Sequence, residues 1–314
     1  MKLHKDRENF SDLIALAAEY IGIPQAAVKR DYYIVKLLQN IQNSEFSDKC
    51  VFKGGTSLSK CYPGSIERFS EDLDLTFISS ENLSNKQYNK ALKHMESIII
   101  GDAHFEIIEN ERNDRNKSSY VWFEDEDKIT GRIKLEIGSS VRPEPFEKRG
   151  LKTYIQEYLE AKGMPDVVTE FELEEIKMLV LRIERTFVDK LFSVKRHAIC
   201  GTLPDKVRHI YDVTKLYAMA EIQSFMADKA LLKSIVAKTK KTDSFYLEKR
   251  NLPKDYDPIG PYDFPSWEAY FDVNIRKRYE SLHEDLLYTN QCQNFAEAVS
   301  TFKRVSTLLS EIGE

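Results

Sequence analysis

Two aspartates stand two residues apart in the alternating stretch Asp72-Leu73-Asp74-Leu75. Successive side chains of a strand point to opposite faces, so a strand here would place both carboxylates on one face and both leucines on the other. Two neighbouring carboxylates repel each other unless a cation lies between them, and an all-oxygen pair suits Mg²⁺, which takes few carboxylates together with substrate phosphates. The alternative is the solvated face of an exposed strand. We interpret Asp72 and Asp74 as a candidate pair of metal ligands.

A glycine pair precedes this stretch in Gly54-Gly55-Thr56-Ser57, directly after the apolar run 50–52. A strand that enters Gly-Gly and then Thr-Ser predicts a tight turn that opens a helix. Glycines let the backbone approach a ligand closely, and the free N–H groups of a helix start can bind phosphate oxygens. The stretch matches neither a Walker A loop nor a dinucleotide-binding glycine pattern. The alternative is a plain strand–turn–helix corner capped by Thr56 or Ser57.

A third carboxylate would complete a site for two-metal phosphoryl transfer, because the metal that activates the attacking hydroxyl also needs a ligand. Glu136 is the favoured candidate, since the segment 132–137 alternates charged and apolar residues and leaves Glu136 on the polar face. Glu106, in the alternating segment 104–107, is the alternative.

Two further candidates fall in predicted helices. Lys190 lies at the border of the apolar and polar stripes of its helix, where a compact ammonium could meet a triphosphate as a point charge. The alternative is a lysine whose stem covers the edge of the core. Asp212, on the next helix, could orient Lys190 or the nucleotide, and its alternative is an ion pair with Arg208 one turn away.

The segment 182–217 around these residues is basic, with eight Lys and Arg, four Asp and Glu and a local net charge of +4. A basic pair of helices beside the metal site is where a triphosphate and an RNA backbone could bind. The alternative is a solvated basic face, above all for members expected to face outward such as Lys195 and Arg196.

The remaining periodicity indicates which elements position these residues. Apolar residues recur at helical spacing in the first fifty residues, period two dominates between 50 and 137 around a polar helix at 84–99, and two prolines at 143 and 145 mark a boundary. Helical spacing then covers 151–161, 172–199, 205–220, 224–238, 267–286 and 293–311. We therefore predict an α+β protein, with a mixed-sheet domain that includes N-terminal helices over residues 1–148 and a helical domain over residues 149–314.

Composition narrows the class of protein. The 314 residues carry 46 Lys and Arg against 51 Asp and Glu, a formal net charge of −5, so a nucleic-acid role would need a local basic patch. Four scattered cysteines without a CxxC pattern argue against a disulfide scaffold and a zinc ribbon. No apolar run approaches the roughly 18 residues of a membrane span, and the polar first residues are unlike a signal peptide. We expect a soluble, cytoplasmic protein.

The combination of Gly-Gly-Thr-Ser-Leu-Ser-Lys at 54–60 with Arg-Phe-Ser-Glu-Asp-Leu-Asp-Leu at 68–75 resembles the AbiEii/AbiGii family of nucleotidyltransferases. The segments 23–24, 29–33, 185–190 and 208–213 resemble further stretches of that family, in the same order along the chain. The resemblance spans roughly residues 20–220. It implies a nucleotidyltransferase-like fold for the N-terminal domain.

The resemblance also implies a function. Members of the family are toxins of type IV toxin–antitoxin and abortive-infection systems, so we expect Mg²⁺-dependent transfer of a nucleoside monophosphate from an NTP to the 3′ end of tRNA. Asp72, Asp74 and Glu136 would hold the metal. The turn 54–57 and Lys190 would bind the nucleotide, and Asp212 would complete the site. The expected protein partner is a cognate antitoxin, often a winged-helix protein encoded alongside, and no membrane is involved.

Two other functions remain open from the residues alone. One is an enzyme of the same fold that modifies hydroxyl groups of proteins or small molecules, and the other is a nucleotide-binding regulator without turnover. Ser70 stands just before Asp72, where a phosphoryl group would add negative charge beside the metal carboxylates and switch the enzyme off. Its alternative is a simple turn residue.

Overall fold

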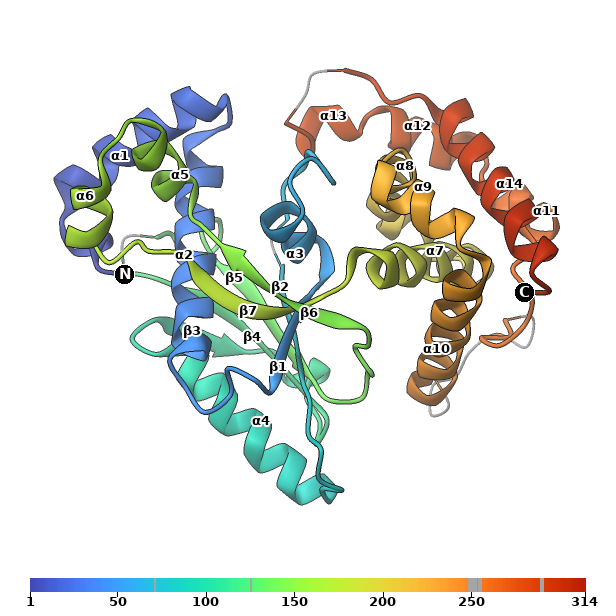
Figure 1. Ribbon diagram of the computed structural model, residues 1–314, viewed down its shortest axis with the longest axis horizontal. Coiled ribbons are helices and arrows are strands. Elements are labelled where there is room, and N and C mark those ends of the chain that lie inside the picture. The colour runs from blue at the N-terminus through green and yellow to red at the C-terminus, as the bar shows by residue number, and fades with distance from the viewer. Residues whose placement is uncertain (71, 125, 248–252, 254–255, 289–290) are drawn as a thin grey trace. The chain divides into compact units, whose positions relative to one another are not determined.

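The computed structural model describes residues 1–70, 72–124, 126–247, 253, 256–288 and 291–314 (Figure 1). Glu71, which belongs to the stretch 68–75, is outside the described residues. The chain divides into two compact units, each described here by itself. The first unit comprises Met1–Cys61 and Ser70–Val180, and the second comprises Tyr62–Phe69 and Leu181–Glu314.

A seven-stranded mixed sheet organises the first unit, with the strand order β3-β4-β5-β2-β1-β7-β6 (Figure 1). Strand β2 pairs antiparallel with β1 on one side and parallel with β5 on the other. The strands are β1 (Cys50–Lys53), β2 (Asp72–Phe77), β3 (His104–Ile107), β4 (Asn116–Trp122), β5 (Ile133–Gly138), β6 (Phe146–Leu151) and β7 (Ile176–Leu181). The two strands that carry the candidate carboxylates, β2 and β5, are therefore direct neighbours.

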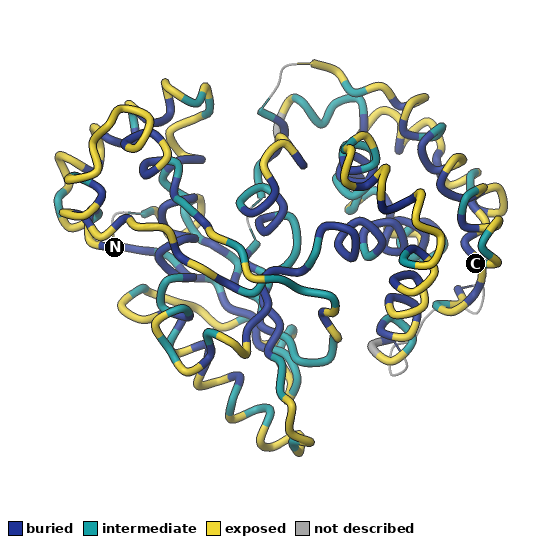
Figure 2. Tube along the Cα trace, in the orientation of Figure 1, coloured by how far each residue is buried: buried dark blue, intermediate teal, exposed yellow. Residues whose placement is uncertain are grey.

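Helices of the first unit cover the apolar face of this sheet. Leu73 and Leu75 of β2 are buried, as are Ile133, Leu135 and Ile137 of β5. Helix α4 packs on β4 and β5 and contacts α2, and Figure 2 shows its outer side exposed. A reciprocal capping box between Ser84 and Gln87 starts α4. The helices are η1 (Leu3–Lys5), α1 (Arg7–Ile21), α2 (Gln25–Gln42), α3 (Gly54–Cys61), α4 (Asn85–Ile100), η2 (Glu109–Glu111), α5 (Tyr154–Ala161) and α6 (Pro165–Glu170).

The second unit consists mainly of helices. Helix α7 packs against α8 and α10, and an aromatic cluster around Trp267, Phe271 and Phe302 fills the space beside α14. The helices are α7 (Ile183–Ile199), η3 (Leu203–Lys206), α8 (Val207–Tyr217), α9 (Ala220–Ala227), α10 (Lys229–Leu247), α11 (Phe264–Trp267), η4 (Glu268–Tyr270), α12 (Val273–Glu280), α13 (Leu282–Asp285) and α14 (Phe295–Glu311). Among the described residues, every helix is too short or too polar to span a membrane.

The helix predicted over 172–199 was wrong in its first half. The segment begins as strand β7, in which Ile176, Met178 and Val180 are buried, and helix α7 starts only at Ile183. Short apolar runs fit either a buried strand or a buried helix, and the parallel pairing of β7 with β1 decides between them. Because β7 pairs with β1, it belongs to the sheet of the first unit, which extends to Val180. We had expected the first domain to end at residue 148.

Smaller differences concern other elements. Strands β4 and β6 were not predicted, because their residues show little alternation between polar and apolar types. The run 224–238 is divided at Asp228 between α9 and α10, and the run 267–286 is divided into short helices from α11 to α13. The overall plan of a mixed sheet followed by helices is as predicted.

Candidate active site

The two aspartates of β2 lie on the polar face of the sheet, as predicted. Asp72 and Asp74 are half-buried, whereas Leu73 is fully buried on the opposite face. In the parallel pairing of β2 with β5, Asp74 is the register partner of Glu136. Register partners on paired strands share a face and stand about 4.8 Å apart. The three candidate carboxylates are therefore adjacent on one surface of the first unit.

Two lysines balance this negative charge. Lys134 Nζ lies 2.5 Å from Glu136 Oε1 and 2.8 Å from Glu111 Oε2, and Lys53 Nζ lies 3.8 Å from Asp74 Oδ1. Partial burial opposes the charged form of Lys134, but its bonds to both glutamates outweigh burial and raise the pKa of its ammonium. Within the described ranges, no three His, Cys, Asp or Glu side chains converge to enclose a metal ion. The Asp72 and Asp74 pair nonetheless matches the sparse carboxylate set that Mg²⁺ uses beside substrate phosphates.

The alternative third carboxylate, Glu106, lies on the same face but farther away. A row of register partners runs from Asp72 through Lys134 and Tyr120 to Glu106. Three strand spacings separate its ends, a distance of about 14 Å. Glu106 pairs instead with Lys128, at 2.8 Å. The geometry therefore favours Glu136.

The glycine turn lies against the metal strand. Helix α3 begins at Gly54 directly after β1, as predicted, and Gly54 adopts a φ of +84°. A Cβ atom on Gly54 would lie 2.2 Å from Asp74 Oδ2. Both the backbone conformation and this close approach require glycine. The start of α3 and the Asp74 carboxylate are therefore in direct contact.

Thr56 and Ser57 lie within α3 rather than at its cap. The Thr56 hydroxyl bonds to the Asp72 carbonyl oxygen at 2.5 Å and lies 2.9 Å from Ser70 Oγ. The Ser57 hydroxyl donates to the Gly54 carbonyl oxygen at 2.9 Å. Both residues are buried. The Thr56 side chain therefore holds the turn against β2, and the Ser57 side chain stabilises the backbone of the turn itself.

Lys190 and Asp212 meet in the second unit. Asp212 is fully buried, and its carboxylate accepts hydrogen bonds from Lys190 Nζ at 2.7 Å and from Arg68 Nε and Nη2 at 2.6 and 2.7 Å. Burial alone would raise the pKa of Asp212, but Arg68 and Lys190 outweigh it and hold that pKa well below its usual range. Lys190 is only 7% exposed, so it lies deeper than the helix border at which we expected it.

The family model of AbiEii nucleotidyl transferase toxins of type IV toxin–antitoxin systems matches residues 36–300, a range that contains all of these side chains. The chain belongs to the AbiEii family. It is therefore a nucleotidyltransferase and a toxin of a type IV toxin–antitoxin system. No curated protein matches the chain.

Two solved structures are similar to this chain. The nucleotidyltransferase toxin MenT4 from Mycobacterium tuberculosis H37Rv is 19% identical with a TM-score of 0.50, over 95% of this chain and 98% of MenT4. JHP933 from Helicobacter pylori is 18% identical with a TM-score of 0.42, over 92% of this chain and 93% of that one. The likeness to MenT4 confirms the predicted nucleotidyltransferase-like α+β fold of this AbiEii chain.

Arg68 binds Asp212 in this cluster, although no local pattern in the sequence indicated a role for it. It stands at the start of the stretch 68–75, and its partner Asp212 lies 144 residues away along the chain. The segment Tyr62–Phe69 belongs to the second unit, where Phe69 N donates to Leu286 O at 2.9 Å and Tyr62 Oη donates to Leu181 O at 3.0 Å. The chain between α3 and β2 is thus anchored among the helices of the second unit.

Lys60, the last residue of the stretch 54–60, also has a distant partner. Its Nζ lies 2.6 Å from Asp31 Oδ1 on α2, and each side chain is only 4% exposed. Asp31 also accepts a hydrogen bond from Tyr154 N at 2.8 Å, and burial raises its pKa despite Lys60. Two stretches that carry the AbiEii resemblance, 29–33 and 54–60, are thereby joined by a buried ion pair.

The expectation that Lys195 and Arg196 face outward was wrong for Lys195. Lys195 is 6% exposed and donates to Pro261 O at 2.8 Å. Arg196 is half-buried and pairs with Asp243 at 3.2 Å. Burial raises the pKa of Asp243 to about 6, against the opposing effect of Arg196. These basic residues of α7 contribute to the interior of the second unit rather than to a solvated face.

Replacement of Gly54 by alanine is expected to lower transfer strongly and to reduce the free energy of unfolding by about 1–3 kcal/mol, because of backbone strain and the clash with Asp74. Gly22→Ala is the matched control, since Gly22 has a φ of +80° but nothing within 4 Å of the place that a Cβ atom would take. Urea unfolding and NTP turnover would be measured on both variants. A wild-type transfer rate in Gly54→Ala would show that the close approach is not needed.

A negative charge at Ser70 is expected to lower transfer by about tenfold or more, since like charges near a protein surface repel by a few kcal/mol. Ser70 is half-buried, and its Oγ contacts Thr56, which in turn binds the Asp72 carbonyl. Ser70→Asp would be compared with Ser70→Ala for transfer rate and NTP affinity. If both variants behave like the wild type, Ser70 is only a turn residue.

Proposed function

We propose that this AbiEii-family toxin is a Mg²⁺-dependent enzyme that transfers a nucleoside monophosphate from an NTP to the 3′ end of tRNA. The observation that carries the proposal is the placement of Asp72, Asp74 and Glu136 on adjacent parallel strands, beside the glycine start of α3. A side-by-side arrangement of acidic residues next to a phosphate-binding turn suits phosphoryl transfer, in which charge must be neutralised and two oxygens aligned.

Asp72 and Asp74 would hold the metal, and Glu136 would help to position the attacking hydroxyl. Bound Mg²⁺ supplies Lewis-acid stabilisation of the charge that develops on the phosphoryl oxygens. Lys134 and Lys53 balance the negative charge of Glu136 and Asp74 while the site is free of substrate. Their ammonium groups lower the electrostatic cost of holding three carboxylates on one face.

The start of α3 would bind the β- and γ-phosphates through its backbone N–H groups. Gly54 and Gly55 leave room for close approach of phosphate oxygens, and the helix start favours negative charge. Thr56 and Ser57 use their hydroxyls to fix the turn, as their bonds to Asp72 O and Gly54 O indicate. The predicted nucleotide contacts of these two residues would therefore come from their backbone.

Lys190 would offset the charge of the leaving pyrophosphate, and Asp212 would orient it. Support comes from the 2.7 Å bond between Lys190 Nζ and the buried Asp212 carboxylate, which holds the ammonium in one position. An ammonium fixed in advance stabilises developing charge without reorganisation during the reaction.

The acceptor and the partner are supported by charge and by family. The segment 182–217 has a local net charge of +4 in a chain of net charge −5. Lys195 and Arg196 contribute to the interior, but Lys206, Arg208 and Lys215 are partly exposed, which suits a polyanionic acceptor. Membership of a type IV toxin–antitoxin family supports a cognate antitoxin, for which we propose a winged-helix protein. We further propose that the toxin acts in the cytoplasm, in phage defence by abortive infection.

The decisive experiment offers the purified protein each of four labelled NTPs with Mg²⁺ and an acceptor. Total tRNA, total protein extract and a small-molecule extract would be tested in parallel, and EDTA would remove the metal. Label in the 3′-terminal fragment of tRNA, lost in EDTA, is the expected result. Label in protein or small molecules alone would favour the same fold acting on other hydroxyls, and nucleotide binding without transfer would indicate a regulator.

A further inference from the structure

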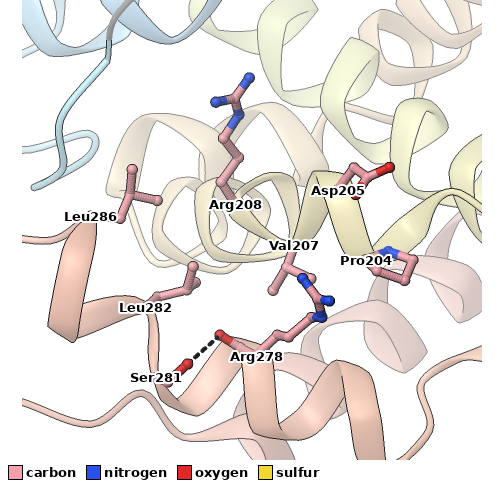
Figure 3. A pocket seen from close by; sticks show the side chains of 8 residues that line it. All are labelled: Pro204, Asp205, Val207, Arg208, Arg278, Ser281, Leu282 and Leu286. Atoms are coloured by element: carbon pink, nitrogen blue, oxygen red, sulfur yellow. Dashed lines mark hydrogen bonds between the residues drawn. The ribbon is translucent and has the colours of Figure 1, made fainter. Parts of the chain in front are cut away.

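A pocket of about 260 Å³ lies in the second unit, at the start of helix α8 (Figure 3). The end of η3, the first turn of α8, and the segment from α12 to α13 form its walls. In the view of Figure 3, Leu282 and Leu286 stand on one side and Asp205 on the other. Ligand pockets usually start near 300 Å³, so this pocket fits a single small unit of a ligand.

The lining combines charge with an apolar wall. Arg208 is half-buried and Arg278 is exposed, and both guanidinium groups can bind phosphate oxygens in a forked geometry. Leu282 and Leu286 are half-buried, so they offer apolar surface to a flat ring. The Asp205 carboxylate can accept hydrogen bonds but cannot donate them. It would therefore repel a phosphate but can accept hydrogen bonds from ribose hydroxyls. These three chemistries together match a nucleotide.

Two backbone hydrogen bonds and one buried ion pair fix the walls of the pocket before any ligand binds. Phe69 N donates to Leu286 O at 2.9 Å, and Tyr288 N donates to Glu67 O at 3.0 Å. The residue between Glu67 and Phe69 is Arg68, whose guanidinium is held by Asp212 of α8. The same ion pair therefore ties the α13 wall to the helix that carries Arg208, and the pocket is formed in advance.

We propose that this pocket binds one nucleotide of the acceptor RNA strand, with its phosphodiester on Arg208 and Arg278, its ribose near Asp205 and its base against Leu282. The inference rests on the proposed function, because it assumes an RNA acceptor. Free nucleotides share this chemistry. Two arginines and one carboxylate have a net charge of +1, which matches one phosphodiester better than a triphosphate.

Binding without turnover tests the pocket. Fluorescence anisotropy would follow a labelled single-stranded oligoribonucleotide ending in CCA, without NTP or metal, on the wild type and on Arg278→Ala. We expect Arg278→Ala to weaken binding by about tenfold, the effect of one charge-assisted contact. The slope of log affinity against log salt should fall by about 0.7, as expected for one phosphate contact to a single strand.

Lys277→Ala is the matched control, because Lys277 is exposed on the same helix, carries the same charge and does not line the pocket. It should change the affinity by less than about twofold, as weak screened surface charges do. Leu282→Ala should weaken binding but leave the salt slope unchanged, since it removes an apolar contact only. Asp205→Ala should reduce the preference for the oligoribonucleotide over the same DNA sequence, because it removes the acceptor for the 2′-hydroxyl that DNA lacks.

Three results would overturn the proposal. Equal losses in Arg278→Ala and Lys277→Ala would indicate a diffuse basic surface, and AMP that competes as well as the oligonucleotide would indicate a mononucleotide site. The third is a wild-type KM for tRNA in Arg278→Ala during labelled transfer. A wild-type KM for tRNA in Arg278→Ala would contradict the pocket but not the proposed function. Absence of label from tRNA with the wild-type enzyme would contradict the proposed function itself.

Discussion

Asp74→Asn is expected to reduce nucleotidyl transfer by at least about 10³-fold, at the upper end of the effect of losing one preorganised charge-stabilising group. Asparagine keeps the size of the side chain beside Gly54 but removes the negative charge that would hold the metal. Asp72→Asn should have a similar effect. Neither variant should melt below the wild type in metal-free buffer, because each loses a like-charged neighbour. Transfer of labelled NTP and thermal unfolding would be measured together.

A second glutamate on the same face of the sheet, Glu106, serves as the control for the assignment of Glu136 as the third carboxylate. Glu136→Gln should lower the transfer rate, because Glu136 is the register partner of Asp74, whereas Glu106→Gln should not, since Glu106 lies three strands from β2 on the same face. Full activity in Asp74→Asn would refute the metal-ligand assignment. A loss in Glu106→Gln that equals the loss in Glu136→Gln would refute the choice between the glutamates.

Arg68→Ala is expected to lower the free energy of unfolding by about 3–5 kcal/mol, the cost of removing one partner from a buried ion pair. The Arg68 side chain is 3% exposed and Asp212 is fully buried, so water cannot replace the lost bidentate contact. Lys215→Ala is the control, because the Lys215–Glu67 pair is 39% and 57% exposed and should contribute about 1 kcal/mol or less. Urea unfolding at pH 7 measures both. Equal costs for the two variants would contradict a structural role for the buried pair.

The pH dependence of the Arg68 effect follows from Asp212. In the folded protein Arg68 and Lys190 hold the pKa of Asp212 below its ordinary value of 3.8. The stability contributed by its carboxylate is therefore fully present above about pH 4 to 5 and is lost as the pH falls through the folded pKa. The stability difference between the wild type and Arg68→Ala should shrink as the pH is lowered below 4. A difference that stays constant down to pH 3 would contradict this ionic origin.

Lys190→Ala tests whether Lys190 acts in the reaction or only stabilises the buried Asp212 carboxylate. It should reduce transfer strongly, and Lys190→Arg should restore activity only in part, because a planar guanidinium does not replace a point charge. Arg68→Ala should also slow transfer, since it loosens the Asp212 carboxylate that binds Lys190. If Lys190→Ala retains the wild-type rate, Lys190 is a structural partner of Asp212 and nothing more.

The amino-acid sequence by itself determined the local features of the candidate site. Alternation at period two was enough to place Asp72 and Asp74 on one face, and the glycine pair after an apolar run was enough to predict the turn that opens α3. Both are properties of a few consecutive residues, and the backbone geometry of a strand or a turn imposes them directly. Alternation of charged and apolar residues likewise predicted that Glu136 lies on the polar face of its strand.

Only the tertiary structure decided which distant residues meet. The register of β2 with β5 places Glu136 rather than Glu106 beside Asp74, and pairing with β1 turns the apolar run 176–181 into a strand instead of a helix. Arg68 forms an ion pair with Asp212, which lies 144 residues away along the chain, and no local sequence pattern predicts this pair. Local periodicity reports which way a side chain faces, whereas strand neighbours and buried ion pairs depend on how the whole chain minimises exposed apolar surface and unpaired charge.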